Sequence, residues 1–332
     1  MGVSADEYYI NDLSSELIDL YDNIRNAEPR FFDYVGRIDA SWVRCTALLG
    51  DGELAGIYSD YRTLAISKDQ LKAAVAGYFR RNAEAVGAII DRDFAAFGDV
   101  LVKELNTNVF RKMARMRELE QTKHELPRKD IYDNIEAAIK SALYMTYRAM
   151  YNDRALIMAD RALHCALFFF IRNYAYSGMF RYSSKGDFNV PYGGIAYNSK
   201  LLSKKTAYYR SEAVARRFAA SHIFNLDFEA FLNQVRPGAD DFVFLDPPYD
   251  SEFSTYARND FTKDDQRRLA AYLIDRCPAR WMLVIKNTDF IYALYNQPGI
   301  NIMSFDKKYM VSFMNRNDKN VTHLIITNYT PS

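Results

Sequence analysis

The feature that most constrains this sequence is an apolar run that ends in an acid and two prolines. Residues 242–245 read Phe-Val-Phe-Leu, which is the pattern of a strand buried in a sheet. Asp246, Pro247, Pro248 and Tyr249 follow at once. Each proline holds φ near about −65° and lacks an N–H group, so the strand ends there in a stiff turn. Because open α/β sheets bind ligands at the carboxyl ends of their strands, we predict a functional turn at a sheet edge.

This turn has the chemistry to hold an amino group on a planar ring. The carboxylate of Asp246 and the carbonyl oxygen of Pro247 both accept hydrogen bonds, and two acceptors match the two hydrogens of an NH₂ group. Tyr249 offers a flat ring on which a base can stack, an interaction worth about 1–3 kcal/mol. The alternative is a proline-stiffened turn without a chemical role. We favour the chemical role, because one given tetrapeptide rarely arises by chance in 332 residues.

The sequence around the turn predicts an α/β fold. Strand and helix patterns alternate in the last third, which favours a mostly parallel sheet. Thr262, with Asp265 three residues later, has the spacing of a helix-capping box. Polar residues 315–320 lie between two strand patterns and predict a terminal antiparallel hairpin. The expected strands are residues 8–10, 223–226, 242–245, 281–285, 309–314 and 321–328.

The middle of the chain is almost wholly helical from about residue 41 to residue 151. Leu71, Val75 and Phe79 recur at helical spacing and predict a buried helix face. The mixed charges of residues 111–130 indicate a solvated helix face and a loop at Pro127.

Composition excludes several classes of protein. With 49% hydrophobic and 26% charged residues, the chain has the usage of a globular protein rather than of a disordered one. Its 43 basic and 42 acidic residues nearly cancel, so contact with a nucleic acid needs a local basic patch. Residues 198–217 carry six Lys or Arg against Glu212 alone, with interleaved tyrosines. Three scattered cysteines and short apolar runs predict a soluble cytoplasmic protein without a metal site or membrane span.

Together with the tetrapeptide, three further segments resemble the Dam-type DNA adenine methyltransferases of class alpha. Residues 178–193, GMFRYSSKGDFNVPYG, are similar to a long motif of that family, with Ser183 where Asn is usual. Residues 10–18, INDLSSELI, and residues 325–329, IITNY, match two other family elements. The resemblance covers residues 6–35 and 165–330.

The resemblance implies methyl transfer from S-adenosylmethionine to the 6-amino group of an adenine flipped out of duplex DNA. It implies a Rossmann-like methyltransferase sheet with a helical insertion and a DNA-recognition subdomain. The implied catalytic residues are Asp246, Pro247, Pro248 and Tyr249, and the implied cofactor-binding residues are Asp12, Asp227, Phe228 and Asp246. The implied DNA contacts are Arg181, Tyr182, Ser183, Lys185, Asn189, Lys200, Lys204, Lys205 and Arg210.

Some of these residues also have purely structural interpretations. Asp12 has the place of a helix cap, and Phe228 has the spacing of a core residue. The basic stretch 198–217 also fits a solvated surface. The domains implied by the resemblance are a catalytic domain of residues 6–40 and 220–330, a helical insertion of residues 41–160, and a motif and DNA-recognition region of residues 161–219.

One family element is not found in this sequence. The family's first strand carries Phe-x-Gly-x-Gly and lies centrally, between the strands that precede Asp12 and Asp246. The glycines of residues 50–56 lie in the helical region, and we expect no amphipathic helix after them. Because buried unpaired strand edges are costly, we expect a small partner polypeptide to supply the strand. The alternative is a sequence that lacks its own start.

Two other functions stay open at this point. An RNA adenine methyltransferase would use the same chemistry on another substrate. A catalytically inactive DNA-binding subunit would keep the basic stretch without the reaction.

Overall fold

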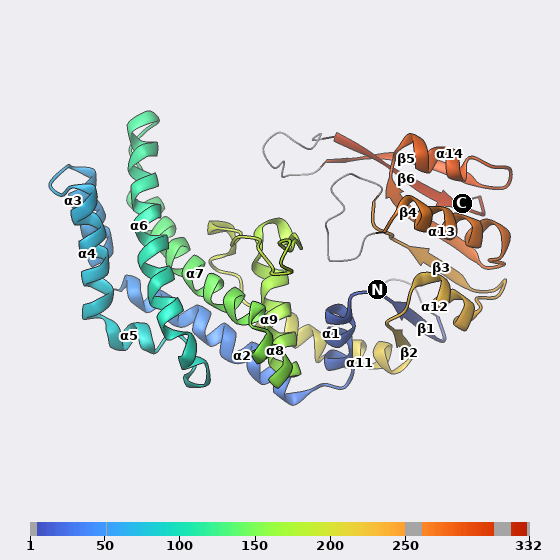
Figure 1. The fold of residues 1–332 in the computed structure, drawn as a ribbon, viewed down its shortest axis with the longest axis horizontal. Helices are drawn as coiled ribbons and strands as arrows, with labels where there is room; N and C mark the ends of the chain where they lie inside the picture. The colour runs from blue at the N-terminus through green and yellow to red at the C-terminus, as the bar shows by residue number, and fades with distance from the viewer. Residues whose placement is uncertain (1–4, 51, 250–260, 309–319, 331–332) are drawn as a thin grey trace. The chain divides into compact units, whose positions relative to one another are not determined.

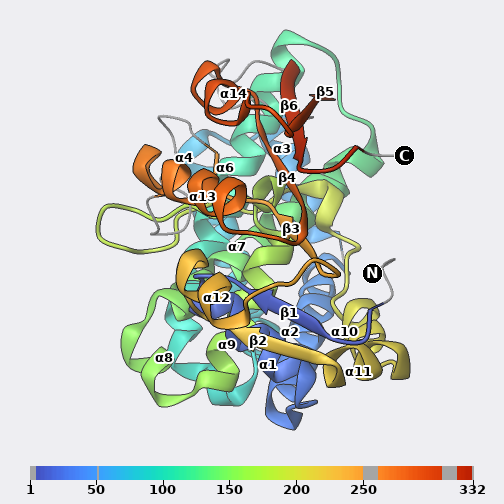
Figure 2. The same cartoon turned by 90° about the vertical axis from the view of Figure 1, so that its right-hand side faces the viewer.

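The computed structural model describes residues 5–50, 52–249, 261–308 and 320–330. They form two compact units. The sheet unit comprises the described residues within 1–18 and 220–332, and the helical unit comprises those within 19–219 (Figures 1 and 2). The structure thus groups the expected insertion (41–160) with the motif region (161–219), because helices of both pack on one another.

The sheet unit contains two pieces of β-sheet (Figure 1). In the smaller piece, β1 (Tyr8–Asn11) pairs in parallel with β2 (Ser221–Phe224). In the larger piece, β3 (Phe242–Leu245) pairs in parallel with β4 (Arg280–Lys286). β6 (Asn320–Thr327) is antiparallel to both β4 and β5 (Asn301–Lys308), which gives the order β3-β4-β6-β5.

The expected terminal hairpin is present, and the described part of its first strand lies before the predicted residues. The strand that pairs with β6 is Asn301–Lys308, whereas the sequence predicted residues 309–314. The latter residues lie outside the described part of the chain. The other expected strands agree with β1, β2, β3, β4 and β6 within a few residues.

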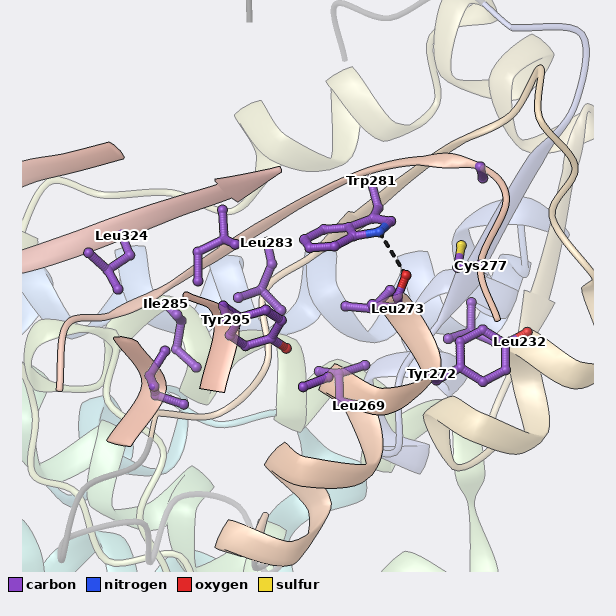
Figure 3. Packing of buried hydrophobic residues seen from close by; sticks show 14 residues of the cluster. Leu232, Leu269, Tyr272, Leu273, Cys277, Trp281, Leu283, Ile285, Tyr295 and Leu324 are labelled. Carbon is purple, nitrogen blue, oxygen red and sulfur yellow. Dashed lines mark hydrogen bonds between the residues drawn. The ribbon is translucent and has the colours of Figure 1, made fainter. Parts of the chain in front are cut away.

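Three helices cover one face of the four-stranded sheet: α12 (Phe228–Val235), α13 (Lys263–Asp275) and α14 (Asp289–Tyr295). Trp281 is fully buried in this core and donates from its indole nitrogen to the carbonyl oxygen of Leu273 at 3.0 Å (Figure 3). The core also contains Leu232, Leu269, Tyr272, Leu283, Ile285, Ile291, Tyr295, Leu324 and Ile326. The predicted capping box starts α13, because Thr262 and Asp265 each accept a hydrogen bond from the other's backbone N–H.

The interpretation of β3 as a fully buried strand is wrong. Val243 and Leu245 pack against the core, but Phe242 and Phe244 point to the opposite face and are half or more exposed. An apolar run of four residues shows that both faces favour contact with apolar groups. The run does not show whether other side chains of this chain cover each face of β3.

The helical unit confirms the helical reading of residues 41–151. Its two longest helices, α6 (Gly98–Thr122) and α7 (Arg128–Asn152), pack on each other. Most charged side chains of residues 111–130 are exposed and residues 123–127 join the two helices, as expected, while Met113, Ala114 and Met116 are buried. Leu71, Val75 and Phe79 are buried in α4 (Lys68–Arg81) as predicted. The remaining α-helices are α1 (Ser15–Arg25), which begins in the sheet unit, α2 (Pro29–Arg44), α3 (Glu53–Arg62), α5 (Ala83–Gly87), α8 (Arg154–Ala159), α9 (Arg161–Tyr174), α10 (Ser203–Tyr209) and α11 (Glu212–Ala219).

One expectation about the glycines of residues 50–56 needs correction. An amphipathic helix does follow them, since α3 buries Leu54, Tyr58 and Tyr61 along one side. However, Gly50 follows a short 3₁₀ helix (Cys45–Leu49) rather than a strand. Gly50 and Gly52 therefore lie between two helical segments, and Gly56 lies within α3. Within the described ranges, no helix is both long and apolar enough to cross a membrane.

Candidate functional site

The Asp-Pro-Pro-Tyr turn leaves the sheet where the sequence placed it. Asp246 follows the last residue of β3 and is exposed. Gln266, which is fully buried in α13, donates from Nε2 to the carbonyl oxygen of Pro248 at 2.9 Å. The turn is therefore fixed both by its prolines and by a helix of the core. No local pattern in the sequence pointed to Gln266, which lies 18 residues further along the chain.

Tyr249 is held from the side by a histidine. Its ring is half-buried and meets the ring of His323 edge-on, with centroids 5.3 Å apart and planes at 73°. His323 is buried in β6, beside Phe305 of β5. The sequence analysis did not single out His323, and its only signal in the sequence is its place directly before the apolar residues 324–326. The pair sets the orientation of the Tyr249 ring, which is the surface expected to receive a base.

Asp12 and Asp227 follow the carboxyl ends of two neighbouring parallel strands, β1 and β2. Asn11 joins these ends, because its side chain donates to the carbonyl oxygen of Leu226 at 2.9 Å and accepts from the Leu226 N–H at 3.0 Å. Asn225 donates to the carbonyl oxygen of Asp12 at 2.8 Å. The structure thus brings two predicted cofactor residues to one edge of the smaller sheet.

The carboxylate of Asp12 serves the turn before α1. Its Oδ1 accepts from the Ser14 N–H at 2.8 Å, and the Ser14 hydroxyl accepts from the Leu17 N–H at 3.3 Å. Ser14 therefore caps the helix, and Asp12 shapes the turn that leads to it. This contact engages one of the two carboxylate oxygens of Asp12.

Asp227 and Phe228 share one arginine that the sequence analysis missed. Asp227 caps α12 by accepting from the Glu229 N–H at 2.9 Å, and the same oxygen accepts from Arg268 at 2.9 Å. The Arg268 guanidinium also lies 4.9 Å from the centre of the Phe228 ring. Hydrogen bonds from Arg276 and Arg268 lower the pKa of Glu229 beside them. Phe228 packs partly against the core, so its core and ligand-facing interpretations are both compatible with its place.

Residues 181–189 of the helical unit form a small hairpin. Tyr182 bridges to Phe188, and the Ser183 N–H donates to the carbonyl oxygen of Asp187 at 2.7 Å. Arg181 donates from Nε to Oδ1 of Asn189 at 2.8 Å. Lys185 is exposed at the tip. Five of the residues assigned to DNA contact by resemblance therefore lie on one compact loop.

Helix α7 holds this loop in place. The hydroxyl oxygens of Tyr151 and Tyr182 are 3.1 Å apart. Asn152 donates to the carbonyl oxygen of Phe188 at 3.0 Å and accepts from the Phe188 N–H at 2.9 Å. Tyr144 donates to the carbonyl oxygen of Val190 at 3.0 Å. The helical insertion is thus a support for the family motif.

The next part of the motif region is anchored at Asn198, which is buried. Its carbonyl oxygen accepts from Trp42 at 3.3 Å and from the ammonium of Lys140, itself buried in α7. Its Oδ1 accepts from the Tyr192 hydroxyl at 3.1 Å. A second anchor lies at the start of α10, four residues after Asn198. There the N–H groups of Leu202 and Ser203 donate to the Asp39 carboxylate of α2.

The basic residues differ in whether a neighbouring side chain or carbonyl oxygen engages them, although Lys205 and Arg210 are exposed. Lys200 donates to the carbonyl oxygen of Asn173 at 2.5 Å, and burial lowers its pKa. Lys205 donates to Oδ1 of Asn173 at 2.6 Å, and the Arg210 guanidinium lies 4.2 Å from the centre of the Phe32 ring. Lys185 and Lys204 are exposed. Their ammonium groups are the better placed of the predicted set to meet a phosphate.

The described residues thus define an α/β protein whose acidic, proline-stiffened turn stands at the carboxyl end of a parallel strand. Among them, no cluster of His, Cys, Asp and Glu fits a metal ion. Residues 77–311 match the D12 class N6 adenine-specific DNA methyltransferases, and the chain belongs to this family. Members of the family use S-adenosylmethionine as the methyl donor.

Curated relatives agree with this assignment. The chain is 32% identical over 166 residues to the type II methyltransferase M.CviBI of Paramecium bursaria Chlorella virus NC1A, covering 49% of this chain and 60% of the relative. It is 34% identical over 179 residues to M.MjaIII of Methanocaldococcus jannaschii, covering 51% and 59%. It is 28% identical over 177 residues to the DNA adenine methylase of Vibrio cholerae, covering 51% and 59%. The match spans about three fifths of each relative.

Proposed function

We propose that this chain transfers a methyl group from S-adenosylmethionine to the 6-amino group of an adenine in duplex DNA. The observation that carries the proposal is the turn after β3, where Asp246 is exposed and buried Gln266 holds the carbonyl oxygen of Pro248. A rigid pair of acceptors beside an aromatic ring suits an amino group on a planar base. The family match supplies the substrate class.

The chain's own residues position the base. The adenine leaves the duplex at a cost of about a few kcal/mol, because its amino group is otherwise paired. Tyr249 stacks on the flipped ring, while Asp246 and the Pro247 carbonyl oxygen accept the two amino hydrogens. This orients the nitrogen lone pair for attack, and positioning provides most of the reduction of the barrier.

The bound donor supplies a methyl group on a positively charged sulfur. The nitrogen–carbon bond forms as the sulfur–carbon bond breaks, and the methylated nitrogen then releases a proton to water. Asp246 stabilises the positive charge that grows on the nitrogen. Asp12 and Asp227, which follow the carboxyl ends of β1 and β2, and the ring of Phe228 are the residues that would hold the donor with Asp246. Their carboxylates suit its hydroxyl and amino groups.

The loop 181–189 and the exposed lysines Lys185 and Lys204 contact the DNA in this proposal. Phosphate contacts of this kind make affinity fall as salt rises. The active form also contains a smaller polypeptide that supplies a glycine-rich strand between β1 and β3. Calorimetric titration of the purified chain with S-adenosylmethionine tests this last point, since full affinity without a partner would contradict it.

Substitution of the acidic residue tests the activity. Asp246→Ala is expected to abolish methyl transfer to duplex DNA and to leave DNA binding intact. Asp241→Asn is the matched control, because Asp241 is an exposed acid at the opposite end of β3. Loss of both activities in Asp246→Ala would contradict the assigned role, and methylation of structured RNA in preference to duplex DNA would overturn the substrate.

A further inference from the structure

The first turns of α13 hold two parts of the site that, among the described residues, no strand pairing joins. β2 belongs to the two-stranded piece of sheet and β3 to the four-stranded piece. Gln266 donates to the carbonyl oxygen of Pro248 in the turn after β3. Two residues later in the same helix, Arg268 donates to the carboxylate of Asp227, which follows β2. α13 therefore connects the turn expected to hold the base with the residues expected to hold the methyl donor.

Arg268 engages its whole guanidinium group in contacts with carboxylates. Its Nε and Nη2 donate to Oε2 of Glu229 at 3.1 Å and 3.0 Å. Nη2 also donates to Oδ1 of Asp227 at 2.9 Å, and Nη1 donates to Oδ1 of Asp265 at 2.8 Å. Asp265 is itself held in the capping box of α13. Because the guanidinium is a planar fork, these contacts fix directions as well as distances.

The contacts leave Asp227 with one oxygen for a ligand. Its Oδ1 accepts from Arg268 and from the Glu229 N–H, whereas none of the described residues donates to Oδ2. The side chain of Asp227 is 43% exposed, so a ligand can reach the carboxylate. A carboxylate oxygen accepts one hydrogen of an amino group on a base. Because Arg268 holds Oδ1 in place, it also determines where Oδ2 points.

The same arginine lies against the ring next to this carboxylate. The guanidinium carbon of Arg268 is 4.9 Å from the centre of the Phe228 ring, a position in which the face of the ring attracts a cation. The Phe261 ring meets Phe228 with centroids 5.6 Å apart and planes at 55°. Arg268 thus fixes both a hydrogen-bond acceptor and an aromatic ring just beyond the carboxyl end of β2.

A second arginine separates this role from a simple link between helices. Arg276, which follows α13, donates to Oε1 of Glu229 at 2.5 Å and lies 4.5 Å from the centre of the Tyr272 ring. Both arginines therefore tie α13 to Glu229 of α12. Of the two, Arg268 alone extends the link to the two residues before Glu229. Those two residues are the ones assigned to the donor.

We propose that Arg268 is a positioning residue for the methyl donor: it directs the free oxygen of Asp227 to the 6-amino group of the donor's adenine and holds the Phe228 ring beside that base. Arg268 acts through these two side chains and does not itself contact the donor. The inference rests on the proposed function, which assigns Asp227 and Phe228 to S-adenosylmethionine. It adds that the recognition of the donor's base depends on a side chain of the next helix.

Discrimination between two ligands tests this role. S-adenosylhomocysteine carries the 6-amino group, whereas its analogue with hydrogen in place of that group offers Oδ2 of Asp227 nothing to accept. The methyl-transferring form of the full chain is expected to bind the first about tenfold or more tightly than the second. Arg268→Met should reduce this preference to about threefold or less, because Asp227 loses its orientation. Calorimetric titration measures the Kd of each ligand. A merely structural role would weaken both ligands alike and leave their ratio unchanged.

Arg276→Met is the matched control, because Arg276 also binds Glu229 and lies over an aromatic ring. It is expected to leave both Kd values unchanged. Arg268→Lys keeps the charge but not the planar fork, and is expected to resemble Arg268→Met. In the methyl-transfer assay, Arg268→Met should raise the KM for S-adenosylmethionine by about tenfold and change kcat by about threefold or less.

The positioning role and the proposed function can fail separately. An unchanged preference in Arg268→Met, an equal loss in Arg276→Met, or an active wild type that does not distinguish the two ligands would each overturn the positioning role and leave the proposed function standing. A wild type that transfers no methyl group to DNA would contradict the proposed function, and the positioning role with it.

Discussion

The side-chain nitrogen of Gln266 lies 2.9 Å from the carbonyl oxygen of Pro248, to which it donates a hydrogen bond. Oε1 of the same side chain is buried and bonds to none of the described residues. Gln266 therefore holds the Asp-Pro-Pro-Tyr turn at the cost of one unsatisfied acceptor. A buried unsatisfied acceptor calls for an explanation, and the hydrogen bond to Pro248 points to a positioning role for Gln266.

We predict that Gln266→Met uncouples stability from activity. Methionine fills the same space and removes both the donor and the unsatisfied acceptor, so the free energy of unfolding changes by about 1 kcal/mol or less. The freed turn lowers kcat for methyl transfer by about 10–100-fold. Urea unfolding and a radiolabelled methyl-transfer assay measure the two effects. Gln297→Met is the control, because Gln297 is exposed and bonds only within its own segment. Equal activity of both variants would contradict the positioning role.

The contrast between Thr262 and Gln266 shows what the sequence could reveal. The capping box of Thr262 and Asp265 was predictable because its partners are three residues apart. The contacts of Gln266 with Pro248, of Arg268 with Asp227 and of Lys140 with Asn198 were not, because they join residues 18 to 58 positions apart. Local periodicity carries no information about such pairs.

Phe244 shows a second limit. Its apolar neighbours correctly predicted a strand, and they indicate the environment that the strand prefers. Sequence pattern alone does not show which neighbours surround the strand. The tetrapeptide was informative for a different reason, because its residue types indicate the chemistry of the turn directly. The order of the family segments was informative because it does not depend on which side chains surround each strand.

We predict that Lys140→Met loosens the motif region. The substitution removes the donor to the Asn198 carbonyl oxygen. It also leaves the Glu136 carboxylate, which lies 2.7 Å from the Lys140 ammonium in the wild type, without its partner. The free energy of unfolding falls by about 3 kcal/mol or less, because Glu136 is partly exposed. Limited proteolysis should then cleave within residues 189–202. The control is Lys129→Met on the same helix, whose ion pair with Asp133 is exposed; equal sensitivity of the two variants would contradict the prediction.

The Arg37–Asp91 pair predicts a pH dependence of stability. A hydrogen bond from Arg37, at 2.5 Å, lowers the pKa of Asp91 from 3.8 to about 2. Because the folded pKa lies below the unfolded one, the contribution is complete above about pH 5 and is lost as the pH falls toward 2. The contribution of the pair to the free energy of unfolding is at most about 2 kcal/mol, and screening by solvent reduces it.

Urea unfolding at pH 7 and pH 3 measures this contribution. Asp91→Asn should lower stability at pH 7 and flatten its dependence on pH over this range. Asp93→Asn is the control, since Asp93 also meets Arg37 but its side chain is 69% exposed. A similar loss from both variants would show that the two carboxylates act alike, against the expectation from their burial.

The two groups of lysines make the last prediction, which concerns DNA. Lys204 and Lys185 are exposed, and each is expected to release about one counterion on meeting a phosphate. Lys204→Ala and Lys185→Ala should therefore each reduce the slope of log Kd against log salt by about 1 and leave Tm unchanged. Lys200 is engaged by the Asn173 carbonyl oxygen and lies 5.0 Å from the centre of the Tyr197 ring. Lys200→Ala should lower Tm and leave the slope unchanged. The reverse result would be a changed slope of log Kd against log salt for Lys200→Ala and an unchanged slope for Lys204→Ala. Because only a phosphate contact changes the number of ions released, that result would mean that Lys200 leaves Asn173 and contacts the DNA.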